Sequence, residues 1–225
     1  MFPIRDTVPN RTVPLNTWVL IILCALVFLF EITLPHEVLE NFIYHFGIVP
    51  VDFTKDRHNL SLIDYLSFII TMFLHGGWLH ILGNVWFLKI FGSKVEDQMG
   101  HGRFLIFYLI AGILASIFYI YFNPRSSMPV IGASGAIAGV MGAYFVLFPR
   151  ARILTFIPIF IIPWFIDVPA VFFLGWWFLL QVFSGTVTQV LHSSGEGVAW
   201  WGHIGGFIAG FVLVFFFRKG RRANY

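Results

Sequence analysis

The sequence predicts an all-α membrane protein in which six apolar segments form a bundle of six transmembrane helices. Hydrophobic residues make up 58% of the 225 residues and charged residues 11%, whereas soluble domains are roughly a quarter charged. The apolar residues gather in blocks close to the ~20 residues that cross a bilayer as a helix. The blocks cover residues 16–34, 68–91, 103–122, 130–148, 168–188 and 199–217.

We expect one membrane domain over residues 16–217, flanked by two short polar segments. Residues 1–15 form a cytoplasmic lead-in, and Asn16 or Thr17 is expected to cap the first helix. Residues 218–225 form a basic cytoplasmic tail. The first apolar block is too long for a signal-peptide core and no small-residue cleavage site follows it, so we expect it to be retained as a helix.

Basic residues predict how the chain lies in the membrane. With the N-terminus inside, the inner segments hold eleven lysines and arginines, and the outer loops hold Lys55, Arg57 and Arg125. This asymmetry follows the positive-inside rule and places both termini in the cytoplasm. Because the basic residues lie at the membrane edges, the net charge of +3 does not indicate a nucleic-acid partner.

Two segments are expected to lie outside the helices. Residues 35–67 mix apolar residues with five acidic ones, so we expect them to lie partly in the outer interface. Pro149 ends the fourth helix. Residues 153–167 are apolar but interrupted by Pro158 and Pro163, and we expect them to follow the inner surface.

Four polar side chains on the second, fourth and sixth helices are expected to meet near the outer face. These three helices all run from outside to inside, so their N-terminal ends share one side. Ser134 and His203 each lie about one turn into their helix. His80 and Asn84 lie one turn apart on a common face of the second helix. Polar groups at this depth are costly unless they are paired or face a wet cavity, so the convergence indicates a functional site.

The chemistry of these side chains is that of a serine protease working inside the membrane. Ser134 becomes a nucleophile when His203 accepts its proton. Asn84, His80 and the backbone N–H of Ser134 can donate hydrogen bonds to the oxyanion of a tetrahedral intermediate. No acidic residue lies within the helices where it could orient His203, so we expect a dyad, with Gln181 a structural residue.

Glycines on the fourth and sixth helices form faces of small residues that let two backbones approach closely. Such an approach would bring Ser134 and His203 within hydrogen-bond reach. The glycines expected to pack near the site are Gly132, Gly135, Gly139, Gly206 and Gly210.

Together these motifs resemble the rhomboid family of intramembrane serine proteases, of the compact six-helix prokaryotic type. The segment Gly132–Gly135 resembles the family's nucleophile motif, and His203 with the glycines after it resembles the catalytic histidine. His75, His80 and Asn84 match the pattern HxxxxHxxxN. In that pattern the first histidine is structural, and the second histidine and the asparagine are oxyanion donors.

The resemblance implies hydrolysis of a peptide bond in or near the transmembrane helix of a membrane-protein substrate by a Ser-His dyad. The partners would be such substrates and the lipid bilayer, with no metal and no organic cofactor. The active site would open towards the outer face of a prokaryotic cell membrane, with the fifth helix and residues 186–198 as lateral gate and cap. Glu96 resembles a structural glutamate at the inner end of the second helix. The substrate sequence and the oligomeric state stay open.

The chain departs from the family pattern in three places. The Trp-Arg pair that many members carry in the first loop is absent. Ala138 stands where some members have a tyrosine that packs on the catalytic histidine. Either Trp200, Trp201 or another aromatic residue takes that place, or the histidine is less firmly oriented. Gly202 replaces the more usual alanine before the histidine.

Other function classes fit the sequence less well. His75 and His80 lie five residues apart, which is not the HExxH spacing of a zinc protease. No pair of aspartates lies clearly within the helices, as an aspartyl protease would need. A transporter would be expected to show paired ionisable residues or repeat symmetry. The main competitor is a silent rhomboid-like protein that binds membrane clients. Such proteins lose the serine or the histidine, and this chain keeps both.

Overall fold

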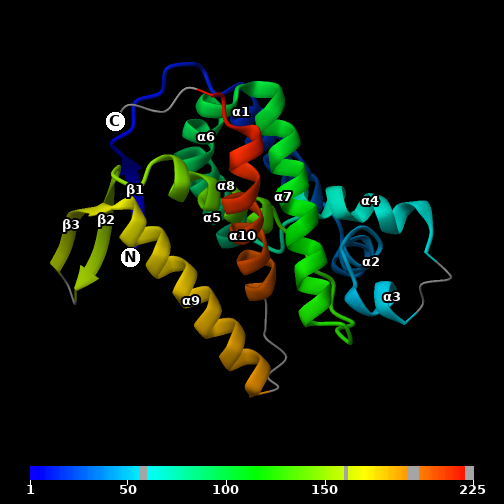
Figure 1. Cartoon of the computed structure of the whole chain (residues 1–225). Helices are drawn as coiled ribbons and strands as arrows, with labels where there is room; N and C mark the ends of the chain where they lie inside the picture. Colours follow the sequence, from blue (N-terminus) through cyan, green and yellow to red (C-terminus); the bar gives the residue numbers. More distant parts are fainter. Residues whose placement is uncertain (56–59, 160–161, 192–197, 221–225) are drawn as a thin grey trace.

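Ten α-helices and a three-stranded sheet make up the described part of the chain, which is residues 1–55, 60–159, 162–191 and 198–220 of a computed structural model (Figure 1). The helices are α1 Leu15–Glu31, α2 His36–Phe46, α3 Pro50–Thr54, α4 Leu62–Ile70, α5 Trp78–Phe87, α6 Ser93–Met99, α7 His101–Phe122, α8 Ser134–Leu147, α9 Ala170–Val190 and α10 Trp200–Phe217. A 3-10 turn, η2, covers Thr71–Phe73 and a π-helical turn, η3, covers Leu88–Gly92. The strands are β1 Phe2–Asp6, β2 Arg152–Ile159 and β3 Ile162–Pro169.

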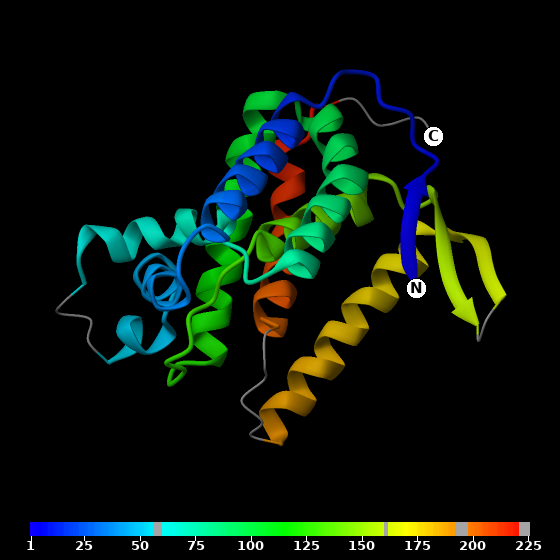
Figure 2. The same cartoon turned by 180° about the vertical axis from the view of Figure 1, so that it is seen from behind.

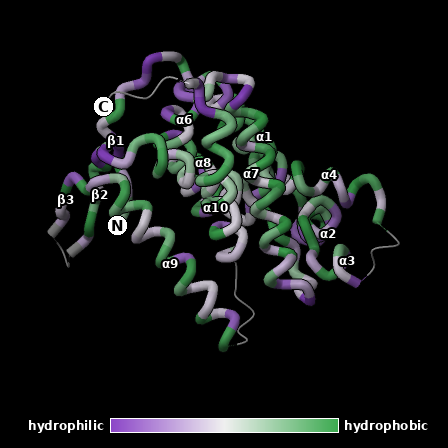
Figure 3. Tube along the Cα trace, viewed as in Figure 1, coloured by the Kyte–Doolittle hydropathy of each residue, from purple (hydrophilic) through white to green (hydrophobic). Residues whose placement is uncertain are grey.

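Three of the described helices, α7, α9 and α10, are each long and apolar enough to cross a membrane. Figure 3 shows mostly hydrophobic residues along α7 and α9. The shorter helices α1 and α8 are also apolar, with 17 and 14 residues. A further pair of segments passes the same test together, which gives up to four candidate spans among the described residues. The chain is therefore mostly helical and suited to a membrane, while the six-span arrangement stays a prediction.

The prediction of one continuous helix over residues 68–91 is wrong. The helical segments Leu62–Phe73 and Trp78–Met99 meet at an angle of 81°. The break between them contains Gly76 and Gly77, and glycine is a poor helix former because its backbone loses the most freedom on folding. His75 therefore lies in a break between helices and not on the helix that carries His80.

The described chain is mostly helical as predicted, but the prediction of a purely α fold is wrong, because Phe2–Asp6, Arg152–Ile159 and Ile162–Pro169 form a small antiparallel sheet in the order β1-β2-β3. Phe2 pairs with Phe156, and the β2–β3 hairpin places Pro158 opposite Pro163. Proline cannot donate to a strand ladder, and this pair lies beside the last described pair, Ile159 with Ile162, so the pairs from Arg152 to Ile157 are kept. The sheet lies beside the start of α9 (Figure 1).

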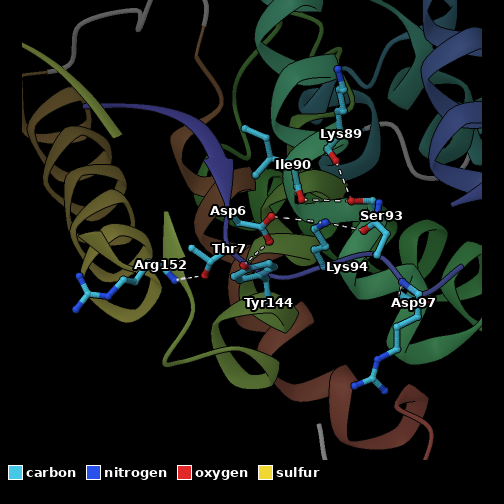
Figure 4. Close-up of polar contacts among 11 residues, drawn as sticks. Asp6, Thr7, Lys89, Ile90, Ser93, Lys94, Asp97, Tyr144 and Arg152 are labelled. Atoms are coloured by element: carbon cyan, nitrogen blue, oxygen red, sulfur yellow. Dashed lines mark hydrogen bonds and ion pairs between the residues drawn. The ribbon is translucent and has the colours of Figure 1, made fainter. Parts of the chain in front are cut away.

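The N-terminal strand is tied to the helices through Asp6 (Figure 4). Tyr144 Oη donates a hydrogen bond of 2.7 Å to Asp6 Oδ2, and Lys94 Nζ lies 3.6 Å from Asp6 Oδ1. Burial raises the pKa of the Asp6 carboxyl, while the hydrogen bond from Tyr144 and the charge of Lys94 act to lower that pKa. Trp86 Nε1 also donates to the carbonyl oxygen of Pro3 at 2.6 Å. The first residues of the chain are thus attached to α5, α6 and α8.

The start of α1 is capped by a carboxylate from α6. Glu96 is fully buried and accepts hydrogen bonds of 2.8 Å from the backbone N–H groups of Asn16 and Thr17. It also accepts the Thr17 hydroxyl at 2.7 Å and lies 2.6 Å from Nδ1 of His101. The first N–H groups of a helix have no partner within it and carry the positive end of its dipole, so they suit a carboxylate. The expected cap by the Asn16 or Thr17 side chain is wrong, since neither side chain makes it.

Two helices at the centre, α8 and α10, touch through their backbones. A Cβ added to Gly206 would collide with the carbonyl oxygen of Gly135, and one added to Gly210 would collide with the backbone of Gly139. Figures 1 and 2 show α8 and α10 side by side, with α7 next to them and α9 running obliquely past them. The glycines therefore determine how closely α8 and α10 approach each other.

We predict that Glu96→Ala destabilises the protein, because it leaves the part-buried N–H of Asn16 and the buried N–H of Thr17 without their acceptor. A hydrogen bond to a charged group contributes about 1.5 to 3 kcal/mol, so we expect a loss of about that size or more in the free energy of unfolding. The measurement is unfolding of the purified protein in detergent by titration with a denaturing detergent. Glu37→Ala on exposed α2 is the matched control and should leave the unfolding midpoint unchanged. Equal midpoints for the two variants would contradict the capping role.

We predict opposite effects for alanine at two helical glycines. Gly206→Ala forces a methyl group into the backbone of α8, and overpacking of this kind costs about 1 to 3 kcal/mol. At Gly175 of α9 nothing lies within 4 Å of an added Cβ. Gly175→Ala should therefore be neutral or stabilising by up to about 1 kcal/mol, since alanine favours the helix. Unfolding in detergent measures both variants, and a Gly206→Ala protein as stable as wild type would disprove the backbone contact.

Candidate active site

The side chains of Ser134 and His203 meet between α8 and α10. The Ser134 Oγ atom lies 2.8 Å from the His203 Nε2 atom, which is the distance of a hydrogen bond. His203 is the fourth residue of α10, one turn from its start. Ser134 is the first residue of α8, so the expectation that it lies one turn into a helix is wrong.

The chain before Ser134 is held in a non-helical conformation by bonds to other segments. Ile48 and Val130 exchange two backbone hydrogen bonds, of 3.1 and 2.8 Å. The N–H of Gly132 donates to the carbonyl oxygen of Thr71 at 2.8 Å. Gly132 has φ +120°, in the region that favours glycine. These contacts delay the start of α8 until Ser134 and leave the first N–H groups of the helix beside the serine.

His80 and Asn84 of α5 lie against the same turn. A Cβ added to Gly132 would be 2.5 Å from His80 Nε2 and 3.7 Å from Asn84 Nδ2. Two side-chain nitrogens from α5 therefore approach the backbone two residues before Ser134. Only glycine leaves room for them, both because of its φ and because any side chain would overlap the His80 ring.

Both α5 side chains have a nitrogen free to act as a donor. Asn84 is 8% exposed, and its Nδ2 atom has no hydrogen-bond partner among the residues that the structure describes. His80 Nδ1 lies 3.4 Å from the backbone N–H of Gly76, which donates to it. A neutral imidazole that accepts at Nδ1 carries its proton on Nε2, the nitrogen that faces Gly132. The site thus holds two donors directed towards one small region.

His75 lies in the break before α5, and its ring contacts the His80 ring edge-on, with 5.2 Å between the ring centroids. Its backbone N–H donates to the buried carboxylate of Glu31 at 3.2 and 3.3 Å. Its Nδ1 atom lies 3.0 Å from the carbonyl oxygen of Phe73. These contacts connect the end of α1 to the break, which agrees with a structural role for His75.

The second ring nitrogen of His203 contacts a residue of α9. His203 Nδ1 lies 2.8 Å from Oε1 of Gln181, a residue that is 6% exposed. From the sequence we expect only a structural role for Gln181, and this contact is not predicted. The sequence does contain a signal for it: Gln181 is the one amide side chain in the apolar block 168–188, and such a group is costly to bury without a partner.

One aromatic ring from α9 and one from α10 contact the imidazole of His203. Ala138 stands where some family members have a tyrosine that packs on this histidine. The Trp177 ring lies 5.9 Å from the His203 ring between centroids, tilted by 34°. Trp200 lies edge-on at 6.3 Å. Trp201 instead stacks on Phe122 at 4.0 Å. Of the two tryptophans named from the sequence, only Trp200 is in ring contact with His203, and Trp177 is the further aromatic residue.

The expected cap over residues 186–198 lies partly outside the described residues. Residues up to 190 belong to α9, whereas residues 192–197 are not described. The expected basic tail, 218–225, is described only as far as residue 220.

Comparisons with known proteins identify the family. The sequence model described as "Rhomboid domain" matches residues 63–220, which is more than half of the chain. The chain is 32% identical to Rhomboid protein 1, mitochondrial, of Saccharomyces cerevisiae over 96 residues, 41% of this chain and 28% of that protein. It is 38% identical to Rhomboid protease GluP of Bacillus subtilis over 89 residues, 40% of this chain and 17% of that protein.

A plant relative is also a rhomboid-like protein that matches over only part of its length. RHOMBOID-like protein 6, mitochondrial, of Arabidopsis thaliana is 41% identical over 75 residues, 33% of this chain and 24% of that protein. The matches to these three relatives thus span between 17% and 28% of the relatives' lengths. The family model and the apolar helices agree with an integral membrane protein, and the family model confirms the resemblance to the rhomboid family, while the compact six-helix prokaryotic type stays a prediction. This chain belongs to the rhomboid family.

Proposed function

We propose that this protein is an intramembrane serine endopeptidase that hydrolyses a peptide bond in or near the transmembrane helix of its substrates. The observation that carries the proposal is the 2.8 Å contact between Ser134 Oγ and His203 Nε2. Nucleophile and base at this distance, with donors beside them, are the arrangement that acyl transfer requires. The rhomboid family and a relative named as a rhomboid protease support the same activity.

In the proposed reaction, His203 Nε2 accepts the hydroxyl proton of Ser134 while Oγ attacks the carbonyl carbon of the scissile bond. The resulting oxyanion is bound by Asn84 Nδ2, by the Nε2–H of His80 and by the backbone N–H of Ser134. The intermediate collapses, and the departing amine takes the proton from His203. A water molecule then attacks the acyl carbon while His203 takes its proton, and the second intermediate collapses to the carboxylic acid as His203 returns that proton to Ser134 Oγ.

The position of Ser134 at the first residue of α8 supports this assignment. The unpaired N–H groups of a helix N-terminus and its dipole stabilise negative charge close to the first turn. The oxyanion would form next to Ser134, where these groups point. The unpartnered amide of Asn84 has a ready role there, since a buried donor without a partner is costly in the resting protein.

The placement in the cell belongs to the same proposal. We place the membrane domain at residues 16–217 with six spans and both termini in the cytoplasm, because of the asymmetry of basic residues. The active site would open towards the outer face of a prokaryotic cell membrane, and the substrates would be transmembrane proteins. The lead-in 1–15 and the tail 218–225 would lie inside.

We predict that Ser134→Ala and His203→Ala each abolish cleavage, because each removes a partner of the proton transfer. The assay is cleavage of a single-span reporter by the purified protein in liposomes. Ser127→Ala in an exposed loop and His36→Ala on α2 are the matched controls, and both should cleave like wild type. A fluorophosphonate label should modify wild type but not Ser134→Ala. Cleavage by Ser134→Ala at the wild-type rate would refute the proposal. Wild-type protein that neither cleaves nor takes the label would favour the client-binding alternative.

We predict that Asn84→Ala lowers kcat by roughly two to three orders of magnitude and leaves a measurable residue of activity, since His80 and the Ser134 N–H still donate. The loss should appear in kcat more than in KM, because the oxyanion exists only after attack. Asn41→Ala, an exposed position on α2, is the matched control. Full activity of Asn84→Ala would rule out the oxyanion role.

A further inference from the structure

The amide of Gln181 is oriented by its own helix. Gln181 Nε2 donates a hydrogen bond of 3.2 Å to the carbonyl oxygen of Trp177, one turn earlier on α9. With the NH₂ group used in this way, the amide oxygen is the atom that faces His203 Nδ1, at 2.8 Å. The side chain is buried, so water does not compete freely for either atom.

This orientation selects one tautomer of His203. An amide oxygen can only accept a hydrogen bond, so Nδ1 of the imidazole must carry the proton. A neutral imidazole has a single N–H, and Nε2 is therefore unprotonated and able to accept from the Ser134 hydroxyl. The opposite tautomer would place two acceptors 2.8 Å apart at the Gln181 contact. It would also place the only N–H of the imidazole on Nε2, facing Ser134, where a base is needed.

We propose that Gln181 is a positioning residue that holds His203 in the Nδ1–H tautomer and directs Nε2 at Ser134. The inference rests on the proposed function, because it assigns a role to a residue of that site. Gln181 occupies the place that a carboxylate takes in a Ser-His-Asp triad, where it fixes the tautomer and orientation of the imidazole.

A neutral amide suits this place at membrane depth. A carboxylate would bury an ion among apolar helices, which is costly unless the ion is fully paired. An amide provides the same acceptor without a net charge. The difference is that Gln181 orients the imidazole but does not supply a negative charge to the imidazolium that forms during the reaction.

The test compares Gln181→Leu, Gln181→Glu and the control Gln189→Leu, which makes the same change at an exposed position two turns along α9. The first readout is the ¹⁵N NMR spectrum of histidine-labelled protein in nanodiscs, in which His203 is assigned by comparison with His203→Ala. Wild type and Gln189→Leu should show the Nδ1–H tautomer at His203. Gln181→Leu should show a mixture of tautomers, and Gln181→Glu should restore the wild-type pattern.

The second readout is cleavage of the single-span reporter. Loss of one buried hydrogen-bond partner should lower the kcat of Gln181→Leu about tenfold or more, with KM little changed. Gln181→Glu should recover most of kcat. The proposal is overturned if wild-type His203 carries its proton on Nε2, if Gln181→Leu keeps the wild-type tautomer and kcat, or if Gln181→Glu is as defective as Gln181→Leu.

The two readouts separate this inference from the proposed function. The tautomer is measured without any cleavage, and Ser134→Ala protein gives the same information. A wild-type protein with the Nδ1–H tautomer but no protease activity would remove the proposed function and leave the positioning geometry intact. An active wild-type protein in which Gln181→Leu changes neither readout would remove only the role of Gln181.

Discussion

The backbone contact between α8 and α10 is the constraint on which the site depends. A serine hydroxyl lies only one bond beyond Cβ, so Ser134 reaches His203 only if the two helices nearly touch. Lipid provides no hydrophobic force between membrane helices, and their association relies on close packing and hydrogen bonds. Gly135, Gly139, Gly206 and Gly210 allow that packing because a Cβ at either residue of α10 would overlap the backbone of α8. The same glycines that pack the helices therefore set the distance between nucleophile and base.

The site is assembled where helices are interrupted, which is unusual in a membrane protein. Backbone groups in a bilayer must find partners within the protein, and irregular backbone is tolerated only where it is buried or faces water. The interruptions here obey this rule. The N–H of Gly132 bonds to Thr71, Val130 bonds to Ile48, and the N–H of His75 bonds to Glu31. Glu31 and Thr71 thus satisfy groups that a continuous helix would satisfy itself. The result is a turn that brings α5 donors and the start of α8 together.

Composition and spacing predict the membrane class, the family and the residues that meet, because burial and polar placement leave strong signals in an apolar sequence. Composition and spacing do not predict the sheet, the helix break or the Gln181 contact, because local propensity and tertiary contacts decide these features. The alternating β-branched residues Ile153, Thr155 and Ile157 are a strand signal that the neighbouring prolines obscured. The break at Gly76 was hidden because hydropathy continues through it. The contact of Gln181 with His203 joins residues 22 positions apart on two helices, and only the packing of those helices determines it.

On the proposed function, a movement of α9 that admitted substrate would also act on the base, because α9 carries the Gln181 contact to His203. Trp177, Gln181 and Gly185 are spaced four residues apart and form one face of α9. Trp177 and Gln181 contact His203, and a Cβ added to Gly185 would lie 3.2 Å from Trp200 of α10. A tilt or rotation of α9 that opened a lateral path would move this face as a unit. On the proposed assignment, His203 would then lose its acceptor at Nδ1 and be free to change tautomer. His203 would hold the Nδ1–H tautomer only when α9 packs against α10 again. Hydrolysis would therefore follow closure of α9 around the substrate. A neutral hydrogen bond suits such a cycle, because breaking it leaves no buried charge unpaired.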